Sequence, residues 1–178
     1  MIFYAVQYLV IYFNMILFLD FDGVLHPVRA TIDQFFCHAP LLDTYLQRHH
    51  ADAKIVLSTS WREPHSIEEL LDFLPDTLHH RILGVTVEDA HPGPRQMNEL
   101  LFYRSPRHAQ ILHYLHEHGL SEHPWMALDD DPKLFEPAAP QLVYCNPAIG
   151  LTPRDLETLT AHHTASYATP GYETFSLV

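Results

Sequence analysis

The chain has 178 residues with 47% hydrophobic content, enough to bury one core, so we expect a single domain. Its formal net charge is −12, with only 10 Lys and Arg residues, which excludes an extended interface with a nucleic acid backbone. A substrate held through one terminal phosphate is compatible with this charge. The two cysteines, Cys37 and Cys145, form no paired motif, which favours a reduced, cytoplasmic protein.

The N-terminal segment MIFYAVQYLVIYFNMILFL is almost entirely apolar. A signal peptide would have Lys or Arg before its apolar region, and this segment has none. Its last residues also belong to a predicted strand, which cannot lie in lipid as well. We therefore expect no membrane span. Residues 1–14 form an apolar extension with three alternative roles: an extra strand, a dimerising segment, or a stretch upstream of a start at Met15. The sequence leaves the oligomeric state open.

Residues 16–25, ILFLDFDGVL, are the most informative segment of the chain. The apolar run predicts a buried strand of a parallel sheet, and Gly23 allows a sharp turn directly after it. Asp20 and Asp22 are therefore expected at the carboxyl end of a central strand, where open α/β sheets bind their ligands. Two carboxylates at this position repel one another and are costly to desolvate, so a cation or a reacting group is expected to compensate them.

Strands and helices alternate along the rest of the chain. Short apolar, partly β-branched runs predict further strands at residues 54–58, 81–87, 125–129 and 141–145. Helix signals lie between them, at Pro40, at the Ser66/Glu69 capping box, at Ser105-Pro106 and at Thr152-Pro153. This alternation predicts a Rossmann-like α/β fold, a three-layer sandwich with helices on both faces of a central parallel sheet of about five strands.

Polar side chains follow two of the predicted strands. Ser58, Thr59 and Ser60 end the second strand, and Asp129, Asp130 and Asp131 end the fourth. In a parallel sheet, all of them emerge at the same edge as the acids of the first strand. Either group alone is typical of a turn or a cap, but several carboxylates on one edge need compensation. A hard cation such as Mg²⁺ provides it, because Mg²⁺ takes carboxylate, carbonyl and water oxygens and binds substrate phosphates.

The order of these motifs resembles that of the haloacid dehalogenase-like (HAD) phosphohydrolases. These enzymes have D-x-D-G-V after a first strand, Ser or Thr after a second, a basic residue opening a later helix, and Asp-Asp after a further strand. The strings LFLDFDGVLHP, LSTSWR and WMALDDD are similar to the capless HAD domain found in Swiss Army Knife RNA repair proteins. The resemblance spans residues 16–159, nearly the whole chain.

The resemblance implies a role for each matching residue. Asp20 is the implied nucleophile, which forms an aspartyl-phosphate. Asp22 is the implied general acid and base, and its backbone carbonyl also helps to hold the metal. Thr59 is the implied hydroxyl that bonds a phosphoryl oxygen, with Ser58 as the alternative if the strand ends one residue earlier.

The implied basic residue is Arg107, with Arg104 as the alternative, although the family more often has Lys at this position. The residues expected at the substrate phosphate are Ser58, Ser60, Arg62 and Arg104. The implied Mg²⁺ ligands are Asp20, Asp22, Asp129 and Asp130.

The intervals between the motifs leave no room for a large cap domain. We therefore expect an HAD-like domain at residues 15–162, followed by a tail at residues 163–178. The resemblance implies a Mg²⁺-dependent phosphomonoesterase acting through an aspartyl-phosphate. Because an open site admits a phosphate on the end of a large molecule, the expected substrate is a phosphorylated macromolecule, such as a nucleic acid end. The alternatives are a phosphatase of nucleotides or sugar phosphates and a non-catalytic, phosphate-binding regulatory module.

Overall fold

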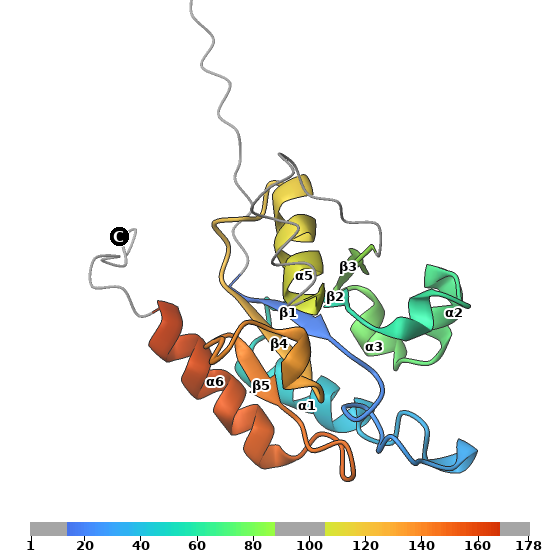
Figure 1. Cartoon of the computed structure of the whole chain (residues 1–178). Helices are drawn as coiled ribbons and strands as arrows, with labels where there is room; N and C mark the ends of the chain where they lie inside the picture. The colour runs from blue at the N-terminus through green and yellow to red at the C-terminus, as the bar shows by residue number, and fades with distance from the viewer. Residues whose placement is uncertain (1–13, 88–105, 168–178) are drawn as a thin grey trace, which may run out of the picture.

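The sheet is built around β1 (Ile16–Leu19), in which every residue is buried. The computed structural model of the chain describes residues 14–87 and 106–167. In this part of the chain, five parallel strands lie in the order β3-β2-β1-β4-β5 (Figure 1). The other strands are β2 (Lys54–Leu57), β3 (Ile82–Val85), β4 (Trp125–Asp129) and β5 (Leu142–Tyr144). The strand order reverses between β1 and β4, the position at which α/β sheets open a ligand crevice.

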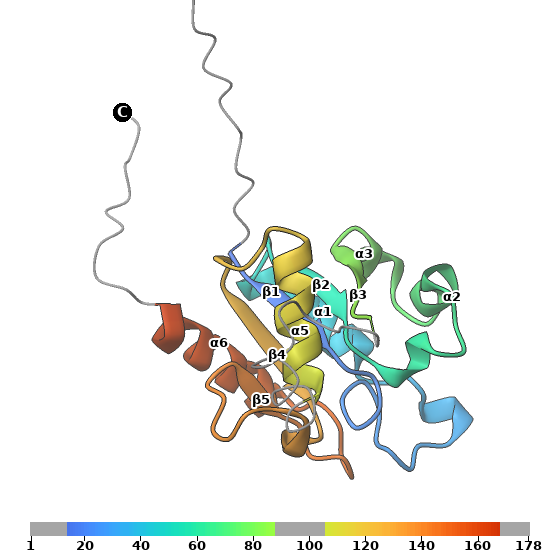
Figure 2. The same cartoon turned by 45° about the horizontal axis from the view of Figure 1, so that its top comes forward.

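Helices cover both faces of the sheet, as Figures 1 and 2 show together. One face is covered by α5 (Pro106–Glu117) and the opposite face mainly by α1 (Ala39–His49) and α6 (Pro153–Tyr167). The shorter helices are α2 (Ile67–Asp72), α3 (Asp76–His79) and the 3-10 helices η1 (Ile32–Gln34), η2 (Ser60–Arg62) and η3 (Pro132–Leu134). This arrangement confirms the predicted three-layer α/β fold with a central parallel sheet.

Alternate side chains of β1 belong to two separate cores. Leu17 and Leu19 pack with buried leucines of α1, α2, α3 and α6 on one face. Ile16 and Phe18 pack on the other face, with Ile111 and its neighbours on α5. A strand buried on both faces has no freedom to shift its register. The residue that follows β1, Asp20, is therefore held in a fixed place at the edge of the sheet.

Gly23 lets the loop after β1 pass directly against the loop after β4. Its φ is +67°, and a Cβ built on it would lie 2.3 Å from the Asp130 Oδ2 atom. The turn is closed by the Leu25 N–H, which donates to the Phe21 carbonyl at 2.8 Å. Any side chain at position 23 would both strain the backbone and push Asp130 away from its place. The glycine predicted to permit a turn thus also permits the approach of an acid.

The predicted strands are all present, and most are shorter at their ends than the sequence suggested. β4 has the predicted bounds of residues 125–129. The helix α3 was missed, because four residues are too few to show a helical period. The helix α6 continues to Tyr167, past the expected start of the tail at residue 163. The extension at residues 1–13, the Ser105 cap and the end of the tail lie outside the described residues.

Within residues 14–87, the connections that follow β1 and β2 contain only the short helices η1, α1, η2, α2 and α3. None of these connections forms a cap domain over the sheet, in agreement with the prediction that these intervals are too short for one. Among the helices of the described ranges, none combines the length and the apolar character that crossing a bilayer requires.

Removal of residues 1–14 is expected to leave the fold intact. β1 is hydrogen-bonded to β2 on one side and to β4 on the other, so neither side of it is open to a strand from the N-terminus. A chain that begins at Met15 should unfold within a few degrees of the full chain in a thermal melt followed by circular dichroism. A chain that begins at Phe18 is the control and should not fold, since it lacks half of β1. Insolubility of the chain from Met15 would assign residues 1–14 to the fold or to an interface.

Candidate active site

Three carboxylates meet at the carboxyl edge of the sheet, between β1 and β4. Asp20 directly follows β1, Asp129 is the last residue of β4, and Asp130 comes next. One oxygen from each side chain lies within 4.8 Å of the other two. Asp20 is 6% exposed and Asp129 is 2% exposed, so two of these acids are largely withdrawn from water. Such a cluster is costly unless positive charge compensates it.

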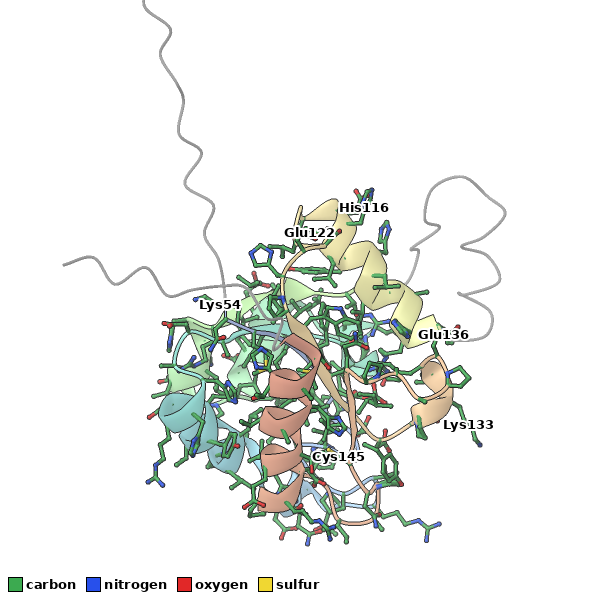
Figure 3. All side chains as sticks on the ribbon, turned by 90° about the vertical axis from the view of Figure 1, so that its left-hand side faces the viewer. Lys54, His116, Glu122, Lys133, Glu136 and Cys145 are labelled. Carbon is green, nitrogen blue, oxygen red and sulfur yellow. The ribbon has the colours of Figure 1, made fainter. Side chains whose placement is uncertain are left out.

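Arg107, in the first turn of α5, places a positive charge in this carboxylate cluster. Its Nη1 atom lies 3.2 Å from Asp20 Oδ2 and 3.1 Å from Asp129 Oδ2. Burial acts to lower the pKa of Arg107, but the charges of Asp20 and Asp129 outweigh burial and raise it. Lys133, in η3 after β4, is also close in sequence to the acids, but it points outward into solvent (Figure 3). The predicted basic residue is thus in place, and its alternative, Arg104, lies outside the described residues.

One guanidinium does not balance three carboxylates. Burial raises the pKa of Asp20, although the Arg107 charge, the Phe21 N–H and the Thr59 hydroxyl each act to lower it. Burial raises the pKa of Asp129 to about 7, with Arg107 opposing and the Asp20 charge contributing to the rise. Burial and the Asp20 charge raise the pKa of Asp130 to about 6. The cluster without a metal therefore takes up protons near neutral pH.

The hydroxyl groups of Ser58 and Thr59, directly after β2, contact different neighbours. The Thr59 hydroxyl hydrogen-bonds to Asp20, where it acts to lower the carboxyl pKa, and it also accepts the Trp61 backbone N–H at 3.3 Å. The Ser58 hydroxyl instead accepts a hydrogen bond from Thr86 at 3.5 Å, on the side of β3. Of the two hydroxyls that the sequence left open, Thr59 is the one beside Asp20.

Ser60 and Arg62, which follow β2, were also predicted to contact the substrate phosphate. Ser60 is exposed and begins η2. The Arg62 guanidinium donates to the Thr59 carbonyl and, at 3.3 Å, to Gln110 Oε1 on α5. Arg62 thereby ties the loop after β2 to α5, so its observed contacts hold the backbone of Thr59 in place.

Asp131, the last of the three consecutive acids, has a structural role. Its Oδ1 atom accepts the Lys133 N–H at 3.0 Å and caps η3. Its own N–H donates to Asp129 Oδ1 at 2.9 Å. Within the described ranges, the cluster of possible metal ligands consists of Asp20, Asp129 and Asp130 and does not include Asp131.

The chain matches a protein family described as the HAD domain in Swiss Army Knife RNA repair proteins, over residues 16–156. It belongs to this family. The match runs from β1 into α6 and includes Thr59, Arg107 and all three acids of the cluster. No curated protein and no solved structure matches the chain. The resemblance inferred from the motifs is confirmed, and it supports a hydrolase of the HAD type, with phosphatase as the general class.

The donor set of this HAD domain fits Mg²⁺. Asp20, Asp129 and Asp130 each offer a carboxylate oxygen within 4.8 Å of the others, and hard oxygen atoms are the ligands that Mg²⁺ prefers. Burial, together with the charge of Asp20, raises the pKa values of Asp129 and Asp130, so Arg107 alone does not offset the cost of their charged forms. These three side chains would hold the cation. Asp22 was also predicted as a ligand, through its backbone carbonyl, and its side chain does not join the three.

The Asp22 carboxylate has its own surroundings. Its Oδ1 atom lies 3.1 Å from His26 Nε2, and its Oδ2 atom accepts the Trp61 Nε1–H at 2.9 Å. The side chain is 43% exposed, whereas His26 is 1% exposed. His26 and Trp61 were not predicted as site residues, although both lie in strings that carried the resemblance. The sequence signals that could have identified them are a histidine four residues after Asp22 and a tryptophan directly after residues 58–60, which all carry hydroxyl groups.

The stability of the metal-free HAD domain is expected to fall as the pH rises. Asp129 and Asp130 have folded-state pKa values of about 7 and about 6, above the ordinary value of 3.8, so the folded state binds protons that the unfolded chain has released. Their stabilising contribution is complete below pH 3.8 and is lost as the pH rises through about 6 to 7. With EDTA, the Tm should be higher at pH 5 than at pH 8.

Two further melts make this prediction specific. Added Mg²⁺ should raise the Tm more at pH 8 than at pH 5, because protons compete with the metal for the carboxylates. Asp130→Asn should weaken the pH dependence, and Asp72→Asn, at an exposed acid on α2, is the control that should keep it. A metal-free Tm that rises with pH would contradict the assignment.

Proposed function

We propose that this domain is a Mg²⁺-dependent phosphomonoesterase that works through an aspartyl-phosphate on Asp20. Its proposed substrate is a phosphate at the end of a nucleic acid. The observation that carries the proposal is the contrast between the two acids of the D-x-D motif. Asp20 is buried beside Arg107, whereas Asp22 is half exposed and separate from the carboxylate cluster. A nucleophile and a general acid need these different environments.

In the first half-reaction, a carboxylate oxygen of Asp20 attacks the phosphorus atom and the bond to the leaving oxygen breaks. Asp22 gives its proton to that oxygen, so the product leaves as an alcohol. The Phe21 N–H donates to Asp20 Oδ1 at 2.7 Å, which limits rotation of the attacking group. In the second half-reaction, Asp22 takes a proton from water, which attacks the aspartyl-phosphate and releases inorganic phosphate and free Asp20.

Arg107 and Thr59 are proposed to bind the transferring phosphoryl group. Both are buried and both contact Asp20, the residue that would carry the phosphoryl group. Hydrogen bonds from a guanidinium and a hydroxyl would stabilise negative charge on the phosphoryl oxygens. When bound by Asp20, Asp129 and Asp130, Mg²⁺ would add two positive charges to that of Arg107 and lower the barrier to attack by the Asp20 carboxylate on the phosphate anion.

The surface next to Asp22 supports a substrate larger than a phosphate group. The Phe35 ring lies 4.8 Å from the His26 ring, which contacts Asp22, and Phe35 is 40% exposed. Ile32 and Val28, on the same loop, are 87% and 54% exposed. An exposed aromatic ring is a stacking platform for a nucleobase. The net charge of −12 restricts contact to a few nucleotides, because it leaves few cations to follow a long backbone.

Asp20→Asn is expected to abolish turnover without unfolding the domain, because an amide oxygen cannot form the acyl-phosphate. Asp22→Asn should slow both half-reactions by about 10²–10⁴-fold, the usual contribution of general acid–base catalysis. The measurements are phosphate release with Mg²⁺ and trapping of phosphoenzyme by acid quench with radiolabelled substrate. Asp131→Asn is the matched control and should remain close to wild type. Turnover by Asp20→Asn near the wild-type rate would refute the mechanism.

Substrate preference tests the second part of the proposal. A terminally phosphorylated oligonucleotide should give a much higher kcat/KM than glycerol phosphate, because the remainder of the substrate supplies binding and orientation. Its binding should show a shallow salt dependence, with about one to three phosphates neutralised. Phe35→Ala should lower kcat/KM on the oligonucleotide by about 5- to 100-fold, the scale of one stacked base, and lower it less on glycerol phosphate, which has no base to stack.

Leu83→Ala, at a similarly exposed apolar side chain on β3, is the control for Phe35→Ala. Equal rates on free nucleotides and oligonucleotides would favour a small-molecule phosphatase. Phosphate binding without any turnover would favour a regulatory module.

A further inference from the structure

Two N–H groups converge on the Asp22 carboxylate, one on each oxygen, from the buried His26 and the half-buried Trp61. His26 Nε2 lies 3.1 Å from Oδ1, and Trp61 Nε1 donates to Oδ2 at 2.9 Å. His26 comes from the loop after β1, and Trp61 from η2 after β2. Two neighbouring strands thus each deliver one donor to the same half-exposed acid.

The surroundings of His26 determine which of its nitrogens donates. The Phe36 backbone N–H points to His26 Nδ1 at 3.4 Å, so Nδ1 is an acceptor. A neutral imidazole whose Nδ1 accepts carries its proton on Nε2. The neutral ring therefore presents the Nε2–H to Asp22 Oδ1, and its in-plane lone pair, on Nδ1, does not face that oxygen.

Both donors are held rigidly by aromatic contacts. The His26 ring lies 4.8 Å from Phe35 and 5.1 Å from Phe36, measured between ring centroids. The Trp61 ring lies 5.2 Å from Phe36 and 5.2 Å from Phe73, both edge to face. Side chains packed in this way lose little further freedom when they hold a third group.

We infer that His26 and Trp61 are positioning residues that hold the Asp22 carboxyl group in one plane for proton transfer. The inference rests on the proposed phosphatase function, in which Asp22 protonates the leaving oxygen as its bond to phosphorus breaks. A carboxylate has two lone pairs on each oxygen, so one donor on each still leaves a lone pair for the transferred proton. A fixed carboxyl plane keeps that proton aimed at the substrate, which is the orientation effect that makes such a transfer fast.

Leaving-group dependence separates this role from a structural one. Phenyl phosphate has a leaving oxygen that needs a proton, whereas 2,4-dinitrophenyl phosphate has one that departs without it. His26→Phe and Trp61→Phe each remove one donor and keep an aromatic ring in the cluster. Each should lower kcat/KM by about 10- to 100-fold on phenyl phosphate, part of the general acid–base contribution, and by less than about threefold on 2,4-dinitrophenyl phosphate.

The same substitutions in an Asp22→Ala background test whether the effect passes through Asp22. Adding His26→Phe or Trp61→Phe to Asp22→Ala should then cost no further activity on phenyl phosphate. His26→Gln, whose amide can donate from the same place, should recover part of the loss. His38→Phe is the matched control: it removes a hydrogen bond from His38 to the Ile149 carbonyl on a neighbouring loop, and it should leave the ratio of the two substrates unchanged.

If His26→Phe or Trp61→Phe fails to fold, the contact can be tested without changing either donor, by a measurement other than activity. In a ¹H–¹⁵N correlation spectrum, Asp22→Ala should move the indole N–H signal of Trp61 upfield and leave that of Trp125 in place. Equal losses on both substrates, or full losses in the Asp22→Ala background, would overturn the positioning role while the phosphatase proposal stands. An unmoved Trp61 indole signal would overturn it as well. A wild-type protein that releases phosphate from neither aryl substrate nor a terminally phosphorylated oligonucleotide would refute the proposed function, and the positioning role with it.

Discussion

The contact of Arg107 with Asp20 and Asp129 is the interaction on which the site depends. It joins the end of β1 to the end of β4, where the strand order reverses, and to the first turn of α5. The contact is buried, so both acids would be far more costly without the guanidinium. Because Asp130 joins the same cluster, the compensation is incomplete. The excess negative charge makes this edge of the sheet a place for a cation, and the same edge carries the candidate nucleophile.

The two acids of the D-x-D motif are separated by the turn that follows β1. In a continued strand, residues 20 and 22 would point to the same face, and two carboxylates side by side would share one environment. β1 ends at Leu19, and Asp22 lies in the turn that contains Gly23, where its side chain contacts His26 and Trp61. One acid stays in the buried cluster with Arg107, and the other stays half exposed. Two chemically identical residues thereby become suited to different steps.

The loop after β1 also connects the site to the outer surface. From Asp22 the contacts pass to the buried His26 ring and then to Phe35, which is exposed. Val28, Ile32 and Phe35 are exposed on this loop, so it presents apolar surface beside the candidate site. An open site excludes water poorly by itself, and a large substrate that covers Phe35 would supply the missing closure. The same aromatic cluster would then serve two purposes, orientation of Asp22 and contact with the substrate.

The sequence by itself determined the family, the parallel sheet and the residues at its carboxyl edge. Those inferences depend on local properties: apolar runs of strand length, a capping box, and carboxylates directly after strands. Tertiary structure alone decided that Thr59 rather than Ser58 faces Asp20, and that Asp131 caps η3 instead of joining the cluster. It also brought His26 and Trp61 to Asp22, from positions 4 and 39 residues along the chain. Which way a side chain points at the end of a strand depends on neighbours that are distant in sequence, and no local pattern records them.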